Sequence, residues 1–366
     1  MPTFLDRLKH VAPGILLAVM LAVVAEVLAE VTGTAILGFE QSPVSAVMVA
    51  LILGGVLANT IGTPASCEAG ADFSVKRILK FGIILLGFRL SLYEAFQAGL
   101  RAIPVVIASI VTAIALVLLV SKLLGIDRRL GALIGVGTAI CGVSAIVATA
   151  PTIHATEEET GYAVATITVF GLIATLAYPF IGRALFGGLE QSVGLWLGTA
   201  VHDTSQVTGA ALVYSETYAA EATLDTAVVT KLLRNTLMIV VIPLAGIVTQ
   251  RGANPSDSRS RLKQAMSVFP GFVAWFLVLS LLRSTGDAML AGDSPAFLLF
   301  DSGVWNTLSG MLSVTAVACL LVALAGVGLK TDIRKFVHLG IRPFVAGLVA
   351  AVAVGGASAI AVMLLS

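Results

Sequence analysis

Apolar residues form eleven long segments along the chain, and polar residues gather in the stretches between them. A helix needs about 20 apolar residues to cross the hydrocarbon core of a bilayer. The pattern therefore predicts an all-α polytopic membrane protein, a single transmembrane domain over residues 1–366. The predicted spans are Val11–Val31, Pro43–Ile61, Ile78–Tyr93, Ala102–Val120, Leu130–Ile153, Tyr162–Ile181, Val193–Tyr214, Ala227–Val248, Val268–Leu282, Val304–Leu329 and Pro343–Leu365.

Lysine and arginine alternate between the predicted loops. One set of loops holds Arg7, Lys9, Lys76, Arg77, Lys80, Lys122, Arg128, Arg129, Arg183, Arg251, Arg259, Arg261, Lys263, Lys330, Arg334 and Lys335. The other set is acidic, with Glu40, Glu157, Glu158, Glu159, Glu216, Glu221, Asp287, Asp293 and Asp301. Only the loop with Glu94 and Arg101 is mixed. Because basic loops stay in the cytoplasm, the N-terminus is predicted inside and the C-terminus outside.

Two segments share the pattern L-G-x-x-[LV]-x-[ND]-T, at Leu53–Thr60 and at Leu197–Thr204. They lie in the second and seventh spans, so spans 2–6 (43–183) are predicted to repeat as spans 7–11 (190–366). The segment 11–31 is then an extra N-terminal helix. Five is an odd number, so the second copy must be inverted in the membrane, as in many secondary transporters.

Two weaker matches keep the same order along the chain. Arg77–Lys80 corresponds to Lys231–Arg234, and Thr138-Ala139 corresponds to Thr315-Ala316. A cysteine follows each member of the second pair, so Cys141 and Cys319 are predicted to lie near each other. A rival match joins Gly137-Thr138-Ala139 and Ser144 to Gly198-Thr199-Ala200 and Ser205. Those two spans are predicted to run in the same direction, so we interpret this match as shared composition.

Spans five and ten are rich in glycine and small polar residues. Such residues weaken helices and also allow close helix packing. The packing interpretation stays open, but we expect two discontinuous helices that cross at mid-membrane and offer half-helix N-termini to an anion.

Composition narrows the function classes. The chain is 58% hydrophobic and 12% charged with a net charge of +1, so neither a soluble domain nor nucleic-acid binding is expected. The three cysteines have no metal-ligand spacing. The first apolar segment is longer than the core of a cleaved signal peptide. We expect no cofactor other than Na⁺ or H⁺ as a coupling ion.

The most polar stretch at membrane depth lies in the seventh span and runs from His202 to Thr208. Such groups are costly in lipid, so they must line a cavity or pack against polar helices. We expect Asp203 to bind a cation or proton. His202 could titrate or remain a neutral donor.

The eighth span carries Lys231, Arg234 and Asn235 within an apolar run. Lys231 and Arg234 share one helix face. They could reach an interface, pair with Asp203 or bind a small doubly charged anion. Arg89 is a further cation at membrane depth.

Four motifs carry a resemblance to a known family. They are G-T-A-I-C-G-x-S-A-I at Gly137–Ile146, G-T-A-V-H-D-T-S-Q-V at Gly198–Val207, K-L-L-R-N at Lys231–Asn235 and G-V-G-L-K-T-D at Gly326–Asp332. Together they resemble the proposed sulfate exporter family, the YeiH-like bacterial inner-membrane proteins. The resemblance implies a multi-pass transporter related to bile-acid-symporter and cation/proton-antiporter folds, with paired crossing helices.

The sequence thus predicts a secondary transporter of sulfate or sulfite in the bacterial cytoplasmic membrane, coupled to H⁺ or Na⁺. The predicted anion ligands are Thr138, Cys141, Ser144, Thr204, Ser205, Gln206, Lys231, Arg234, Asn235 and Thr315. The coupling residues are Asp203, His202 and Asn59. Alternatives are a cation antiporter, an organic acid or sulfonate transporter, and a channel. An intramembrane enzyme is disfavoured, because His202 and Asp203 fall short of three metal ligands. The expected partners are a small anion, the bilayer and, as an open possibility, a second copy of the chain.

Overall fold

A computed structural model describes residues 4–38, 42, 44–249, 270–292, 294–332 and 341–365. These residues form helices and connecting turns, with one isolated β-bridge between Ala296 and Phe300 and no strand among them. Several of the predicted loop charges lie outside the described residues: Glu40, Arg251, Arg259, Arg261, Lys263, Asp293, Arg334 and Lys335.

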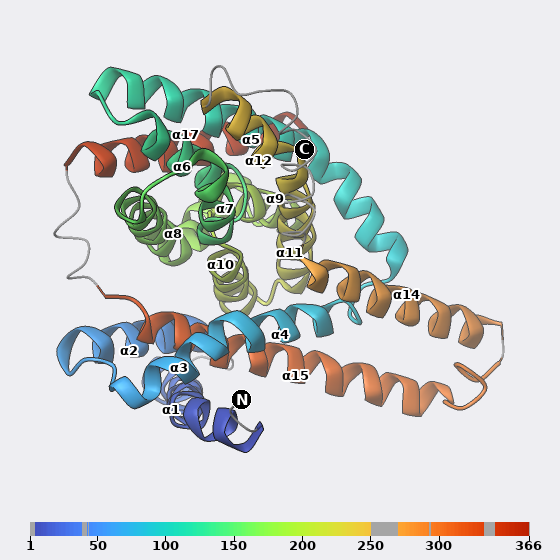
Figure 1. Ribbon diagram of the computed structural model, residues 1–366. Helices are drawn as coiled ribbons and strands as arrows, with labels where there is room; N and C mark the ends of the chain where they lie inside the picture. The colour runs from blue at the N-terminus through green and yellow to red at the C-terminus, as the bar shows by residue number, and fades with distance from the viewer. Residues whose placement is uncertain are drawn as a thin grey trace. The chain divides into compact units, whose positions relative to one another are not determined.

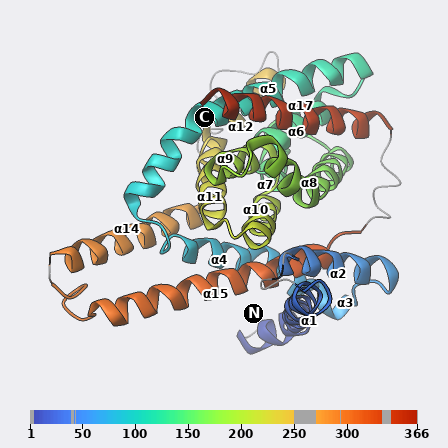
Figure 2. The ribbon, with the colours of Figure 1, turned by 180° about the vertical axis from the view of Figure 1, so that it is seen from behind.

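The helices divide into two compact units. The first unit takes the described parts of residues 1–97, 212–221 and 271–333, and the second takes those of 98–211, 222–270 and 334–366. Figures 1 and 2 show the helices of each unit under the labels used below.

The first unit is a bundle built around α15, which runs beside α2 and α4 (Figure 1). Its other contacts pair α1 with α2 and α3, and α14 with α4. Its helices are α1 (Phe4–Glu30), η1 (Val31–Ile36), α2 (Ala46–Thr60), α3 (Ala65–Phe73), η2 (Ser74–Ile78), α4 (Leu79–Leu86), α14 (Gly271–Ala291) and α15 (Ser302–Leu329).

Glycine lets these helices approach closely. A β-carbon on Gly14 of α1 would lie 2.0 Å from the backbone oxygen of Cys67 on α3. A β-carbon on Gly54 of α2 would lie 2.6 Å from the backbone oxygen of Ala325 on α15. Helices in lipid gain no hydrophobic driving force for association, so close van der Waals packing at small residues stabilises their contacts instead.

The second unit packs α6, α7, α8 and α9 together, with α17 against α8 and α9 (Figure 2). Its helices are α5 (Leu92–Leu124), α6 (Arg128–Ala139), α7 (Val143–Thr149), η3 (Pro151–Ile153), α8 (Glu157–Phe186), α9 (Glu190–Ala200), α10 (Thr204–Tyr218), α11 (Glu221–Thr236), α12 (Met238–Thr249) and α17 (Ile341–Leu365). The first residues of α5, the last residues of α10 and the first residue of α11 belong to the first unit.

Six helical stretches in the described part of the chain are long and apolar enough to cross a membrane. They are Lys9–Ile36, Leu92–Leu124, Glu157–Phe186, Gly271–Ala291, Ser302–Leu329 and Arg342–Leu365. The pair α11 and α12, bent by 43°, makes a seventh if it is counted as one span. The prediction of a polytopic all-helical protein is therefore confirmed at this coarser level.

Several finer predictions are wrong. Span ten is not discontinuous, because α15 is unbroken from Ser302 to Leu329 despite its glycines. Lys76, Arg77 and Lys80 do not lie in a loop, since α3, η2 and α4 follow one another without a gap. Glu94 and Arg101 lie inside α5 for the same reason. In α15 packing outweighs the low helix propensity of glycine, whereas lysine, arginine and glutamate favour helices, so the charged residues do not end α4 or α5.

Candidate functional site

The fifth predicted span is a helical hairpin, here called hairpin 1 (α6 and α7). α6 ends at Ala139, and the chain turns through Gly142, whose φ of 67° suits glycine and whose N–H donates to the Gly137 carbonyl at 3.0 Å. α7 then folds back on α6. A β-carbon on Gly137 would lie 2.8 Å from Cδ1 of Ile146, so the glycine makes room for the returning helix.

Both ends of hairpin 1 lie at the same end of the second unit. Ile126, before α6, packs on the same buried apolar cluster as Ala155 and Tyr162, which follow α7. Asp127 is the N-cap of α6, and its Oδ1 accepts from Arg129 N at 2.7 Å. The hydrogen bond from Arg129 N holds the pKa of the Asp127 carboxyl below its usual value. The structure therefore does not confirm that this segment crosses the membrane, and the placement of Glu157–Glu159 opposite the basic loop stays a prediction.

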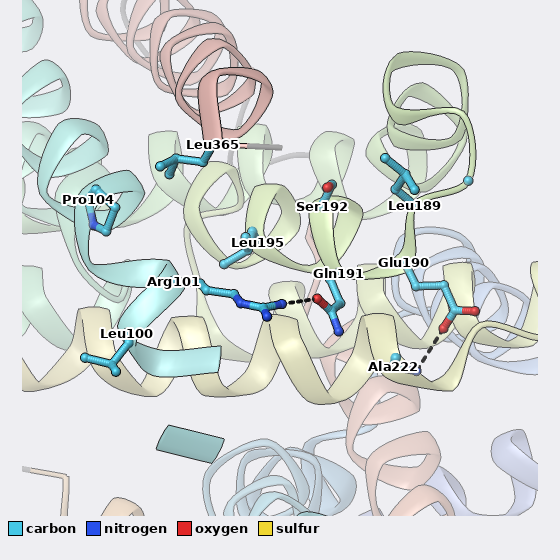
Figure 3. Close-up of a pocket in the computed structure, with 11 residues that line it drawn as sticks. Leu100, Arg101, Pro104, Leu189, Glu190, Gln191, Ser192, Leu195, Ala222 and Leu365 are labelled. Carbon is cyan, nitrogen blue, oxygen red and sulfur yellow. Dashed lines mark hydrogen bonds between the residues drawn. The ribbon is translucent and has the colours of Figure 1, made fainter. Parts of the chain in front are cut away.

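The seventh predicted span is a second hairpin, here called hairpin 2 (α9 and α10). α9 ends at Ala200, Val201 is extended, and α10 begins at Thr204. The chain has returned by Ala222, whose N–H donates to Glu190 Oε2 at 3.2 Å, while Thr223 Oγ1 donates to the Glu190 carbonyl at 3.0 Å. Figure 3 shows this contact between the first residues of α9 and α11.

The ends of hairpin 2 lie opposite the ends of hairpin 1 along α8. Trp196 of α9 packs against Tyr178 and Phe186 in the C-terminal half of α8. Hairpin 1 instead begins and ends near the N-terminus of α8, where Tyr162 packs on its cluster. At the end of the unit where hairpin 2 begins, residues of α5, α9, α11 and α17 line a pocket of about 910 Å³ (Figure 3). Its lining residues include Leu100, Arg101, Leu189, Glu190, Ser192, Ala222 and Leu365.

The tips of the two hairpins meet at the middle of α8. A β-carbon on Gly142 would lie 3.2 Å from Cα, Cβ and Oδ2 of Asp203. At the same level Gln206 Nε2 donates to the Thr168 carbonyl of α8 at 3.1 Å, and its amide occupies the notch above Gly171. The non-helical residues at the two hairpin tips therefore lie against each other.

Lys231 and Arg234 of α11 join the two tips. Both side chains are buried, at 1% and 0% exposure. Lys231 Nζ donates to the carbonyls of Ile140 at 2.9 Å, Val201 at 3.1 Å and His202. Arg234 donates to the carbonyls of Ala139 at 2.6 Å, Thr199 at 2.7 Å, Val201 at 3.2 Å and Thr138.

The carbonyls of Thr138, Ala139 and Thr199 lie in the last turns of α6 and α9, where a helix leaves carbonyls without partners. They carry the negative end of the helix dipole, which a cation stabilises. Arg234 bridges the last turns of α6 and α9 with its planar donors, and Lys231 binds the turn residues that follow. Lys231 and Arg234, the two predicted cations, therefore donate their hydrogen bonds to the backbone carbonyls of the interrupted helices.

Asp203 caps the N-terminus of α10, after the interruption between α9 and α10. Asp203 Oδ1 accepts from Ser205 N at 2.9 Å and from Ser205 Oγ at 2.6 Å, which caps α10. Gln206 Oε1 accepts from Asp203 N at 3.2 Å, and Asn235 Nδ2 donates to Thr204 Oγ1 at 3.2 Å. A capping carboxylate stands where an anion would meet a helix N-terminus.

Other predicted residues of the second unit line the same junction. Cys141 is buried with Sγ 3.4 Å from Met238 Sδ, and Ser144 is exposed on α7. Thr138 Oγ1, both ring nitrogens of His202 and Asn235 Oδ1 are buried without a hydrogen-bond partner among the described residues.

Two predicted site residues belong to the first unit. Asn59 donates to the Gly55 and Thr331 carbonyls, each at 2.7 Å. Thr315 Oγ1 donates to the Met311 carbonyl of its own helix at 2.7 Å. Cys319 also lies in the first unit, whereas Cys141 lies in the second, so their predicted proximity stays a prediction.

The rival sequence match marks the junction. Gly137-Thr138-Ala139 ends α6 and Gly198-Thr199-Ala200 ends α9, so the two matched segments occupy equivalent places in the two hairpins, while their interpretation as shared composition stays a prediction. The two segments do run in opposite directions, because hairpins enter from opposite ends of the unit. The match continues beyond the tips, where Thr166 and Pro179 in the helix after hairpin 1 correspond to Thr230 and Pro243 after hairpin 2.

The described residues include no group of three or more histidine, cysteine or acidic side chains that could hold a metal ion. Apolar helices of both units have exposed faces, on which Leu16 is 67% and Val111 60% exposed. These features define the chain as a multi-pass helical membrane protein.

Comparison with known proteins then gives the family. The family described as Conserved hypothetical protein 698 matches residues 13–347, and the chain belongs to it. A UPF0324 membrane protein of Bacillus anthracis is 32% identical over 309 residues, 83% of this chain and 82% of that protein. A relative in Streptococcus pneumoniae is 31% identical over 85% of this chain and 87% of its own length. These descriptions name a bacterial membrane protein and no substrate.

Proposed function

We propose that the chain is a secondary active transporter that moves a small oxyanion, sulfate or sulfite, across the bacterial cytoplasmic membrane. The observation that carries the proposal is the junction of two opposed hairpins, where Gly142 lies against Asp203 and Lys231 and Arg234 hold both backbones. Interrupted helices that meet at mid-depth are the substrate sites of many secondary transporters.

The charge of the junction favours an anion. Lys231 and Arg234 carry two positive charges and Asp203 one negative charge, so the formal sum is +1. Irregular backbone at membrane depth is tolerated only where protein buries it or it lines a cavity. Ser144, Asp203 and Thr204 are the polar residues at the tips that are not fully buried, and these are the proposed anion contacts.

Asp203 supplies a route to proton coupling. Its carboxylate occupies the N-terminus of α10, where an oxyanion would bind. Protonation would weaken that cap and leave the two cations uncompensated, so anion and proton would bind together. Thr138, Cys141, Ser205, Gln206 and Asn235 would shape the junction around this exchange, and His202 would remain a buried neutral ring.

The topology of the proposal has nine crossing segments and two re-entrant hairpins. Replacing spans five and seven by hairpins leaves the N-terminus inside and the C-terminus outside, as the basic residues indicate. It moves Glu157–Glu159 to the cytoplasmic side and Arg183 to the outside. The long inverted repeat of 43–183 and 190–366, and a homodimer, stay open; the short inverted pair at the hairpins is what supports alternating access.

A cation/proton antiporter is the second candidate, because Asp203 is an incompletely buried carboxylate at the junction. An organic acid or sulfonate would suit the same charge. The proposal includes no enzymatic step and no cofactor.

The test is uptake of radiolabelled sulfate, and then of sulfite, into proteoliposomes under imposed pH gradients. Wild type should take up the anion with the proton gradient, and Asp203→Asn should lose gradient dependence while still folding. Thr285→Ala, which removes an exposed hydroxyl that donates to the Leu281 carbonyl of its own helix, is the matched control and should transport as wild type does. Absence of oxyanion flux in wild type, with proton movement on adding Na⁺, would replace the proposal with the antiporter.

A further inference from the structure

The ammonium of Lys231 lies in a cage of backbone oxygens. Its three donors meet the carbonyls of Ile140, Val201 and His202, with the first two at 2.9 and 3.1 Å. The first oxygen belongs to the tip of hairpin 1 and the other two belong to the tip of hairpin 2. An ammonium has three donors and no acceptor, so the cage saturates it.

Carbonyls of unwound backbone and half-helix C-termini are the groups that coordinate Na⁺ in transporters with interrupted helices. Here the same kind of ligand set, drawn from two interrupted segments, surrounds a side-chain cation. Among the described residues, Lys231 donates its hydrogen bonds to carbonyl oxygens. Asp203, the nearest acidic residue of the tips, directs Oδ1 to Ser205 instead.

Arg234 stabilises the cage independently of Lys231. Its guanidinium binds the carbonyls of Thr138 and Ala139 on one side and of Thr199 and Val201 on the other. The two hairpin tips therefore keep a cationic bridge when the Lys231 side chain is shortened.

We infer that the Lys231 ammonium is a tethered cation that fills a monovalent-cation site at the hairpin junction. The wild-type junction then needs no Na⁺. Shortening Lys231 to alanine opens the cage to Na⁺ or to a small alkylammonium ion. For coupling, a consequence that rests on the proposed transport function, the proton on Asp203 is left as the driving ion.

The experiment measures thermal unfolding of the purified full chain in detergent, in chloride salts of Na⁺, ethylammonium and choline at equal ionic strength. Wild type should have the same Tm in all three. Lys231→Ala should unfold at a lower Tm in choline and should recover by about 2–5 °C in Na⁺ or ethylammonium, in a concentration-dependent way. Lys231→Met, which fills the cage with an apolar chain, should be destabilised and should not recover.

Binding of radioactive ²²Na⁺ to wild type provides a test that does not depend on the variants folding. The inference expects no stoichiometric binding at the junction. Stoichiometric binding that Asp203→Asn or Ser205→Ala weakens would overturn it, as would a Lys231→Ala protein equally stable in all three salts. None of these readouts uses transport, so missing oxyanion flux would remove the proposed function and leave the cage intact.

Discussion

Gly142 and Asp203 touch across the tips of two hairpins that enter the second unit from opposite ends. A β-carbon on Gly142 would lie 3.2 Å from three atoms of Asp203, and the glycine has a φ of 67°. Sixty-one positions separate these residues in the numbering. Their contact makes the junction one structural unit, and it makes the junction sensitive to single methyl groups.

Gly142→Ala is expected to destabilise the protein by about 1–2 kcal/mol, because alanine is strained at positive φ and its methyl group presses on Asp203. The measurement is the Tm in detergent. Gly161→Ala is the control, since it lies in α8 with no neighbouring atom within 4 Å. The control should be neutral or gain up to about 1 kcal/mol. Equal effects of the two variants would show that the tips are not in contact.

The hairpins predict which loops share a side of the membrane. In a background without the three cysteines, Arg129→Cys and Glu158→Cys should both face the cytoplasm, and Leu189→Cys should face outside. A membrane-impermeant maleimide applied to intact cells should therefore label only Leu189→Cys. All three residues are exposed at the ends of the second unit. Labelling of position 158 without position 189 would restore the eleven-span topology.

Arg234→Ala is expected to destabilise the protein severely, by about 3 kcal/mol or more, because it leaves buried carbonyls of α6 and α9 without donors. The measurement is the yield of monodisperse protein together with its Tm. Arg129→Ala, which removes an exposed cation at the start of α6, should change the Tm little. A folded Arg234→Ala protein of wild-type Tm would contradict the bridging role.

The lowered pKa of Asp127 leads us to expect that the free energy of unfolding depends on pH. Its pKa is held below the usual 3.8, chiefly by the hydrogen bond from Arg129 N. The lowered pKa means that the folded state binds fewer protons, so this contribution is present above pH 3.8 and is lost as pH falls through the lowered value.

Asp127→Ala should therefore cost about 1 kcal/mol at neutral pH, the usual cost of losing an N-cap. The difference in Tm between wild type and variant should shrink as the pH falls below about 4. Glu158→Ala, exposed in the first turn of α8, is the control. A difference in Tm that grows at low pH would contradict the assigned cap.

The chemistry of the junction was predictable residue by residue. Lys231 and Arg234 stood out as cations at membrane depth, and Asp203 stood out within the polar stretch of the seventh span. The structure places all three together. Their partners were not predictable, since each cation binds backbone carbonyls that have no sequence signature.

The sequence by itself determined that the chain is a helical membrane protein, because about 20 consecutive apolar residues have no other stable environment. It also predicted an interruption in the fifth span, where the chain turns at Gly142, but it predicted none in the seventh span, where the structure has one before Thr204. Only the tertiary structure decided that these segments turn back. An apolar run has the same composition whether it crosses or returns, and acidic residues contribute little to orientation. The free carbonyls at the end of a half-helix need hydrogen-bond donors. Here Lys231 and Arg234 supply them from α11, a helix farther along the chain, so the turn depends on a tertiary contact.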